Sequence, residues 1–213
     1  MANIFLKDPF KHQIDAVSAC HNTDMDKFAY LMEMGTGKTL TALVDLVLLN
    51  QRDMVDYAVV LAPKSVYRNW MKEINTFLSG EFDYKVNTWD PSLVDPYTNE
   101  YLGTDAFFLK ALKHKLHIFL MNIEALSTPK GTKYLTHLLG RRIPDKMMMI
   151  VDESTTIKTH TAKRTKTLLK MSEKIGYKRI LTGTPITKSP LDIFSQFAFL
   201  DKNILGKNLH NHY

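Results

Sequence analysis

The chain has 213 residues, of which 45% are hydrophobic, and its formal net charge is +6. This length and apolar content suit one α/β domain, and the positive charge favours an anionic partner such as a nucleotide or a nucleic acid. The single cysteine, Cys20, excludes an internal disulfide and a CxxC zinc site. No apolar run approaches the roughly 20 residues of a membrane span, and the N-terminus lacks a secretory pattern. We therefore expect a soluble cytoplasmic protein, from a bacterium or a phage-infected host cell rather than a nucleus.

Short apolar runs alternate with longer helical patterns along the whole chain, which is typical of a mostly parallel sheet with covering helices. The predicted strands are Phe28–Met32, Ala58–Leu61, Lys85–Trp89, Ile118–Met121, Met148–Val151 and Arg179–Leu181. The predicted helices are Pro9–His21, Lys38–Leu49, Val66–Leu78, Asp105–Lys115, Gly131–Leu139, Thr161–Ile175 and Pro190–Phe199. Proline, asparagine and glycine in Asp90–Gly103 predict a surface loop. Since neither a repeat nor a linker is visible, residues 1–213 are predicted to form one domain.

The glycine-rich segment between the first predicted strand and the helix that follows it predicts a phosphate-binding loop. Gly35 and Gly37, on either side of Thr36, allow backbone N–H groups to turn around phosphate oxygens. Lys38 adds a charge for the β and γ phosphates, and Thr39 adds a hydroxyl ligand for Mg²⁺. The strict consensus has a further glycine where this chain has Met32. The alternative is an ordinary strand-to-helix turn with a glycine-rich cap.

Two carboxylates end the apolar strand of residues 147–151. Asp152 is predicted to hold Mg²⁺, commonly through water, and Glu153 to act as the general base that polarises the attacking water. An acidic pair after a strand is also a common helix N-terminal pattern. Its pairing with a phosphate-binding loop favours the functional interpretation.

A third strand ends in Thr182, Gly183, Thr184 and Pro185. The ligand of an open parallel sheet lies beyond the carboxyl ends of its strands. The phosphate-binding loop, the acidic pair and this third motif each follow a predicted strand directly, so all three are expected at one edge of one sheet. The alternative for the third motif alone is a plain turn with threonine caps.

A further candidate precedes the loop. The amide of Gln13 offers both a donor and an acceptor, as an adenine edge does, although a lone glutamine is usually a helix surface residue.

Taken together, these segments resemble the first RecA-like lobe of a superfamily 2 helicase-type ATPase, closest to the Swi/Snf-like DNA translocases. The resemblance covers about residues 8–206, and its matching segments are Phe10–Gln13, Glu33–Thr39, Leu61–Ser65, Asp152–Ser154 and Leu181–Pro185. It implies a RecA-like P-loop fold, a three-layer sandwich with a mostly parallel sheet, and an ATP–Mg²⁺ site. It also implies specific roles: adenine reading by Gln13, nucleic-acid backbone contact by Pro63, Lys64 and Ser65, and coupling of ATP state to movement by Thr182, Gly183 and Thr184.

Two features depart from that family pattern. Its acidic motif often has His or Asp as the fourth residue, where this chain has Thr155. Such motors also have a second RecA-like lobe with arginine fingers, whereas this sequence stops at Tyr213, shortly after the third motif. We therefore expect a fragment, a single lobe, or a chain that works with a separately encoded partner.

Basic residues gather after the acidic motif, with eight Lys or Arg and one acid between positions 158 and 179. Lys158, Lys163 and Arg164 are predicted to contact DNA phosphates. The alternative is a solvated basic helix face, as charge runs usually are.

The leading hypothesis is thus an ATP hydrolase lobe of a DNA translocase or helicase, weakly active alone, that tracks double-stranded DNA. A second hypothesis is a nucleotide-responsive module that binds nucleic acid or protein without turnover. A third, a small-molecule kinase, fits poorly with the acidic pair and the third motif.

Overall fold

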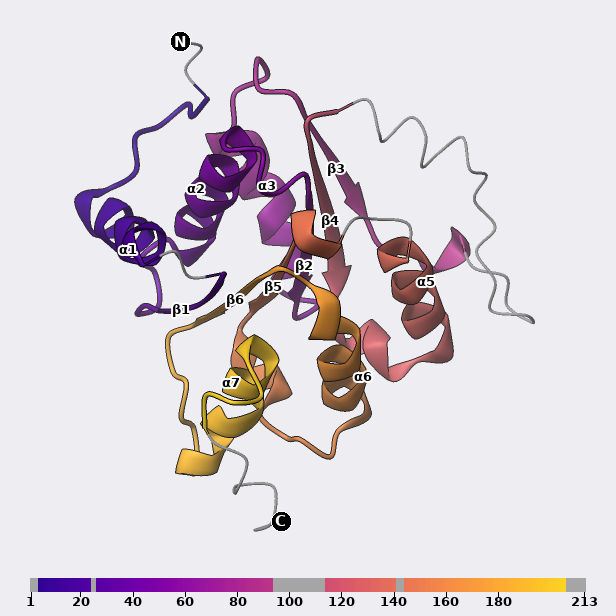
Figure 1. Cartoon of the computed structure of the whole chain (residues 1–213). Helices are drawn as coiled ribbons and strands as arrows, with labels where there is room; N and C mark the ends of the chain where they lie inside the picture. Colours follow the sequence, from indigo (N-terminus) through magenta and orange to yellow (C-terminus); the bar gives the residue numbers. More distant parts are fainter. Residues whose placement is uncertain (1–3, 24–25, 94–113, 141–143, 206–213) are drawn as a thin grey trace.

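The computed structural model describes residues 4–23, 26–93, 114–140 and 144–205 (Figure 1). In this part of the chain, six strands form one sheet in which every neighbouring pair is parallel. The strand order is β1-β6-β5-β2-β4-β3. The strands are β1 (Lys27–Leu31), β2 (Tyr57–Ala62), β3 (Tyr84–Thr88), β4 (Leu116–Asn122), β5 (Met147–Asp152) and β6 (Tyr177–Thr182).

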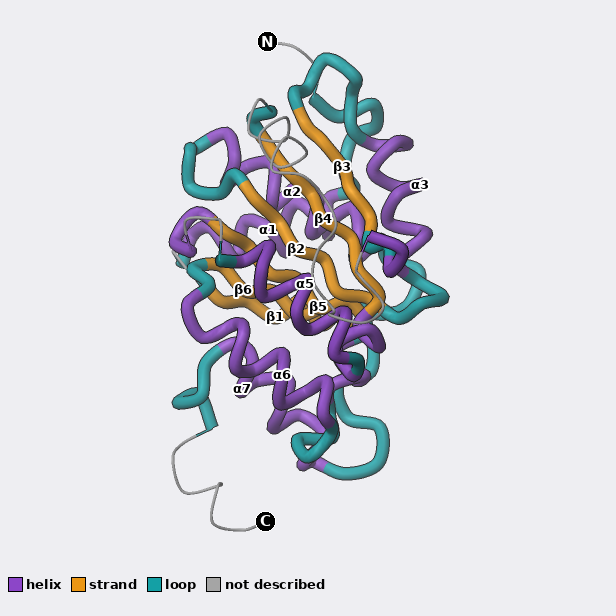
Figure 2. Tube along the Cα trace, turned by 90° about the vertical axis from the view of Figure 1, so that its right-hand side faces the viewer, coloured by secondary structure: helices purple, strands orange, loops and turns teal. Residues whose placement is uncertain are grey.

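Helices cover both faces of this sheet, which makes the three-layer α/β sandwich of a RecA-like fold and confirms the expected fold class (Figure 1). One layer holds α1 (Lys11–Asn22), α2 (Lys38–Gln51) and α3 (Tyr67–Phe77), and the other holds α5 (Pro129–Leu139), α6 (Lys163–Met171) and α7 (Phe194–Leu200). The tube view of Figure 2 shows the strands running between these two groups of helices.

Successive side chains of β2 point to opposite faces of the sheet, and so the strand packs against both layers of helices. Tyr57, Val59 and Leu61 pack into the core beneath α5, α6 and α7, while their neighbours in the strand pack against α2 and α3. All residues of β2 and β5 are buried, as expected for central strands of a parallel sheet covered on both faces. None of the described helices is long and apolar enough to cross a membrane.

The six predicted strands are confirmed, with ends that differ by one or two residues. Most helices are confirmed, but Pro190–Phe199 is observed as a 3₁₀ turn, Pro190–Ile193, followed by α7. The predicted helix Asp105–Lys115 falls almost wholly outside the described residues. Of the predicted loop Asp90–Gly103, the described beginning contains a short 3₁₀ helix, Pro91–Leu93, and residues 94–103 lie outside the described part.

Candidate active site

The loop between β1 and α2 has the backbone shape that phosphate binding requires. Gly35 and Gly37 have φ values of +81° and +79°, which L side chains rarely adopt. A Cβ on Gly37 would also lie 2.2 Å from Nε2 of Gln13, so a side chain there would have to displace the Gln13 amide. Because α2 begins at Lys38, the free N–H groups of its first turn and its dipole point toward the loop.

Lys38 is held inside the loop by long contacts. Its Nζ donates to the carbonyl oxygens of Met32 at 3.3 Å and Glu33 at 3.2 Å. The hydroxyl of Thr36 closes the turn by donating to the Glu33 carbonyl at 2.7 Å. The ammonium therefore lies within the curve of the loop, where phosphate oxygens would meet it.

Gln13 is buried at the start of α1 and joins that helix to the loop. Its Nε2 donates to the Thr36 carbonyl at 3.0 Å and lies 3.4 Å from the Gly37 carbonyl, while its Oε1 accepts from the Phe10 N–H. A cavity of about 600 Å³ opens beside it, between α1, the loop and α3. The same amide thus supports the loop and borders a space large enough for a nucleotide base.

The acidic pair lies at the end of β5, as predicted. Asp152 is buried, and its two oxygens each have one donor: Oδ1 accepts from the Glu153 N–H and Oδ2 accepts from Trp70 Nε1, both at 2.8 Å. Glu153 has a left-handed backbone, with φ of 46°. Such a conformation costs on the order of 1 kcal/mol or more for a non-glycine residue and is often found at functional sites.

Burial is the main influence on the protonation of both acids. It raises the pKa of Asp152, against hydrogen bonds from Trp70 and the Glu153 N–H and the charge of Lys38, which lower it. It also raises the pKa of Glu153, with the neighbouring Asp152 charge adding to the increase. A carboxylate whose pKa is raised accepts a proton more readily, which suits Glu153 to the role of a general base.

The third motif packs directly against the phosphate-binding loop. The N–H of Met32 donates to the Thr182 carbonyl at 3.1 Å, and a Cβ on Gly183 would lie 3.2 Å from both the Met32 carbonyl and the Met34 nitrogen. Thr182 is buried, and its hydroxyl accepts from the Thr184 N–H. Two of the three residues predicted for coupling, Thr182 and Gly183, therefore contact the loop itself, and Thr184 is bonded to Thr182.

A residue that the sequence interpretation missed connects the acidic motif with the third motif. Gln196 on α7 is fully buried, and its Oε1 accepts from the Ser154 hydroxyl at 2.5 Å. Its Nε2 donates to the carbonyls of Pro185 at 2.7 Å and Asp192 at 2.8 Å. Its one signal in the sequence was a lone amide inside an apolar helix, and a buried amide must be hydrogen-bonded.

Trp70 on α3 is fully buried. No local pattern links it to Asp152, which lies 82 positions away. A buried indole N–H nevertheless needs an acceptor, and this requirement is the signal that could have shown a polar contact.

The basic residues after the acidic motif do not form one surface. Lys158 donates to the Thr187 hydroxyl and lies 3.9 Å from an oxygen of Asp192, and Arg164 donates to the Thr156 carbonyl at 2.9 Å. Lys163 is exposed at the start of α6. Arg179, which was counted in the same run, is 1% exposed and pairs with an acid in the core.

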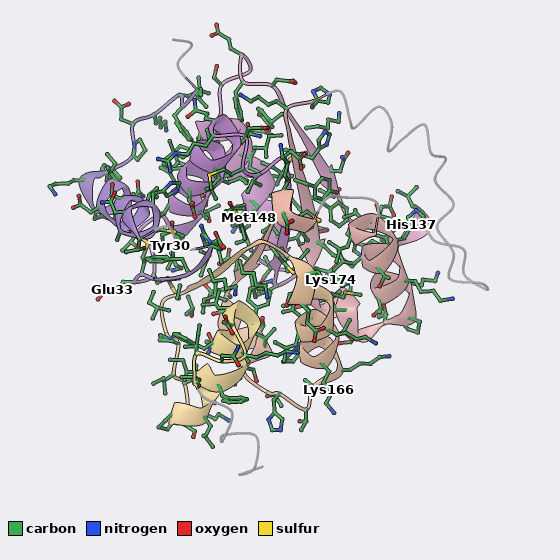
Figure 3. All side chains as sticks on the ribbon, in the orientation of Figure 1. Tyr30, Glu33, His137, Met148, Lys166 and Lys174 are labelled. Carbon is green, nitrogen blue, oxygen red and sulfur yellow. The ribbon has the colours of Figure 1, made fainter. Side chains whose placement is uncertain are left out.

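Elsewhere on α6, Lys166 points outward, well apart from Glu33 of the loop (Figure 3). The other segment predicted to contact nucleic acid, Pro63–Ser65, follows β2 at the carboxyl edge of the sheet. Lys64 and Ser65 are exposed, and Pro63 is half-buried.

The donor set fits a magnesium ion. A carboxylate, Asp152, and a hydroxyl, Thr39, are hard oxygen ligands of the kind that Mg²⁺ prefers alongside phosphate and water. A half-buried acid on α3, Glu73, accepts a hydrogen bond from the Thr39 side chain. At Gly35 nothing lies within 4 Å of the place where a Cβ would stand, so the loop is open on that side.

Comparison with known proteins places the chain in a family. The sequence model of the SNF2-related domain matches residues 12–212. The chain belongs to the SNF2-related domain family. It is 28% identical to Protein CHROMATIN REMODELING 24 of Arabidopsis thaliana over 85% of this chain and 16% of the relative. It is 30% identical to Probable ATP-dependent DNA helicase CHR23 of the same plant, over 84% of this chain and 15% of the relative.

A solved structure shows the same fold. The SWI2/SNF2 ATPase core of Sulfolobus solfataricus in complex with dsDNA matches with a TM-score of 0.68 and 22% identity, over 96% of this chain and 38% of that one. The chain therefore spans well under half the length of the relatives that it matches. These findings confirm the resemblance to Swi/Snf-like ATPases and the RecA-like fold of the first lobe.

Proposed function

We propose that this chain is the ATP-binding lobe of an ATP-driven motor that moves along double-stranded DNA, completed by a second RecA-like lobe. The observation that carries the proposal is the meeting of three strand ends at one loop. Gly183 packs on Met32 and Met34, and the charge of Lys38 acts on both Asp152 and Glu153. A nucleotide site alone does not require the third motif, whereas a motor must transmit the state of the γ phosphate.

In this proposal each residue has one task. Lys38 and the loop N–H groups neutralise the phosphates, and Thr39 and Asp152 hold Mg²⁺, which when bound neutralises charge on the β and γ phosphates. Glu153 takes the proton of the attacking water, and Gln13 borders the adenine. Thr182, Gly183 and Thr184 pass the change at the loop to the rest of the lobe.

Hydrolysis by the 213-residue chain alone should be slow. Arginine fingers from a partner lobe are worth about 10³- to 10⁵-fold in rate in related phosphoryl-transfer enzymes. We expect Mg²⁺-dependent ATP binding by calorimetry, with hydrolysis far below one turnover per second. Several turnovers per second by this chain alone would contradict the need for a second lobe.

The alternative is a module that binds nucleotide without turnover. The retained Glu153 argues against it, since a non-hydrolysing site has no chemical need for that carboxylate. A longer chain that carries a second lobe, compared with its Glu153→Gln variant, separates the two. Equal ATPase rates would remove the hydrolase proposal, and loss of hydrolysis with intact ATP binding would support it.

DNA binding rests on Pro63–Ser65 and on the exposed part of the basic segment, chiefly Lys163. The structural neighbour from Sulfolobus solfataricus was solved in complex with dsDNA, which supports this choice of partner. Fluorescence anisotropy with a duplex at several salt concentrations tests it, because each lost phosphate contact lowers the slope of log affinity against log salt by about one.

A bacterial or phage-infected host cytoplasm remains the predicted location.

A further inference from the structure

Two side chains of α3 lie against the residues proposed to hold Mg²⁺. Trp70 and Glu73 are three positions apart on the helix and therefore share one face. Trp70 contacts Asp152, and Glu73 contacts Thr39. One helix face thus reaches both proposed metal ligands, which come from segments more than 110 residues apart in the sequence.

The contact of Trp70 is short and fully buried. Its indole N–H is its one polar group, and this group donates to Oδ2 of Asp152 at 2.8 Å. The backbone N–H of Glu153 holds the other oxygen, Oδ1. A carboxylate oxygen can accept about two hydrogen bonds, so each oxygen retains a lone pair for a metal or its water while the plane of the carboxylate is held from both sides.

The contact of Glu73 acts on the other ligand. A hydroxyl has one proton and two lone pairs. Because the hydrogen bond to Glu73 uses the one proton of the Thr39 hydroxyl, both lone pairs of that hydroxyl remain available to a metal ion. Burial raises the pKa of Glu73, the Thr39 hydrogen bond lowers it, and the charge of Asp152 raises it, so the three groups influence one another.

We propose that Trp70 and Glu73 are positioning residues that orient Asp152 and Thr39 for Mg²⁺. This inference rests on the proposed ATP–Mg²⁺ site and adds to it the groups that set the geometry of the ligands. Partners behind metal ligands of this kind commonly change metal affinity by about 10- to 100-fold.

The first experiment compares Trp70→Phe with Trp89→Phe in the 213-residue chain. Phenylalanine keeps an aromatic ring and removes only the indole N–H and some volume. Trp89 is the matched control, because it packs edge-on against Tyr134 at a ring distance of 4.8 Å, in the core on the opposite face of the sheet from Trp70. The measurement is the affinity of a fluorescent ATP analogue with Mg²⁺ divided by its affinity with EDTA, and circular dichroism checks the fold.

We expect this ratio to fall by about 10- to 100-fold in Trp70→Phe and to stay at the wild-type value in Trp89→Phe.

The second pair of variants concerns Glu73. Glu73→Gln keeps an oxygen that accepts the Thr39 proton and should retain most of the ratio, whereas Glu73→Ala should lose it. This pair keeps the inference testable if Trp70→Phe fails to fold.

Tryptophan fluorescence provides a further measurement on the same variants. In Trp89→Phe, Trp70 is the one remaining tryptophan, so its emission should change when ATP is added with Mg²⁺ and change less with EDTA. Emission that is the same with Mg²⁺ and with EDTA would count against a link between Trp70 and the metal ligand Asp152.

The outcomes separate the two proposals. Equal affinities of the wild type with Mg²⁺ and with EDTA would overturn the proposed ATP–Mg²⁺ site and this inference with it. A metal-dependent wild type whose ratio survives in both Trp70→Phe and Glu73→Ala would overturn the inference alone. A ratio that falls in Glu73→Ala and is retained in Glu73→Gln would support it.

Discussion

Two polar clusters lie along α2, and they differ in how their hydrogen bonds are satisfied. At the beginning of the helix, Lys38 makes two long contacts, of 3.2 and 3.3 Å, to loop carbonyls. In its middle, Asp45 is fully buried and accepts from Arg179 Nε at 2.6 Å, His21 at 2.8 Å and Tyr30 at 3.0 Å.

The difference distinguishes a candidate ligand-binding site from a structural cluster. The Asp45 cluster ties α1, α2, β1 and β6 together with buried bonds, and both oxygens of the Asp45 carboxylate accept from side-chain donors. The contacts of Lys38 are weak, and phosphate oxygens can replace them at low cost because the carbonyls that would lose the lysine lie on an exposed loop. The predictions below test this contrast, from the largest expected effect to the smallest.

The largest effect should come from Arg179→Met. The change leaves the buried carboxylate of Asp45 without its cation, and breaking one half of a buried pair costs about 3–5 kcal/mol of unfolding free energy. Urea denaturation followed by circular dichroism measures it. The control is Lys27→Met, whose pair with Asp201 is partly exposed and should cost at most about 1 kcal/mol; equal losses would contradict the contrast.

Lys38→Ala should weaken ATP binding and leave the stability of the fold almost unchanged. It removes a charged contact to phosphate, worth about 1.5–3 kcal/mol, so affinity for ATP with Mg²⁺ should fall by about 10- to 100-fold. Unfolding free energy should change by less than about 0.5 kcal/mol, because the replaced contacts are long and partly exposed. Calorimetry with Lys166→Ala, an exposed α6 lysine, as the charge-matched control checks the site; a large loss of stability in Lys38→Ala would show that the loop depends on this lysine for its fold.

Gln196 is an intermediate case, since it is saturated like Asp45 but borders the site. Gln196→Leu leaves the Ser154 hydroxyl and the Pro185 and Asp192 carbonyls without this partner, which should cost about 1–3 kcal/mol of unfolding free energy. A double-mutant cycle with Ser154→Ala isolates the link between the acidic and third motifs. Additive losses would mean that the two side chains do not act together.

Whether a feature could be predicted from the sequence depends on how far apart in the chain its interacting residues lie. The strands and the loop were predictable because apolar runs, Gly35, Gly37 and Lys38 are neighbours in the chain. That three motifs meet at one edge followed from the geometry of parallel strands. The pairing of Arg179 with Asp45 was not predictable, because 134 positions separate the two residues, and local charge instead suggested a solvated run.

The same limit applies within the site. The burial of Trp70 is ordinary for a large aromatic residue, but its acceptor depends on where α3 lies against the end of β5, which no short pattern encodes. Gln196 likewise joins two motifs that the sequence shows only separately. Periodicity predicted the scaffold and the glycine-rich motif predicted the candidate phosphate-binding loop, while the side chains that support the site required the tertiary structure.

The smallest effect concerns the response of the Asp45 cluster to acid. Burial alone would raise the pKa of Asp45, but hydrogen bonds from His21 and the charge and hydrogen bonds of Arg179 outweigh it and lower that pKa below its usual value near 3.8. A carboxyl group whose pKa is lower in the folded state than in the unfolded state stabilises the fold at pH values above its unfolded-state pKa. This contribution is lost as the pH falls through its folded-state pKa. The difference in unfolding free energy between the wild type and Asp45→Asn should therefore be constant from neutral pH to about pH 5 and narrow below about pH 4. Urea denaturation at a series of pH values measures it, and a difference that grows on acidification would mean that the Asp45 carboxylate is not held in its charged form by Arg179 and His21.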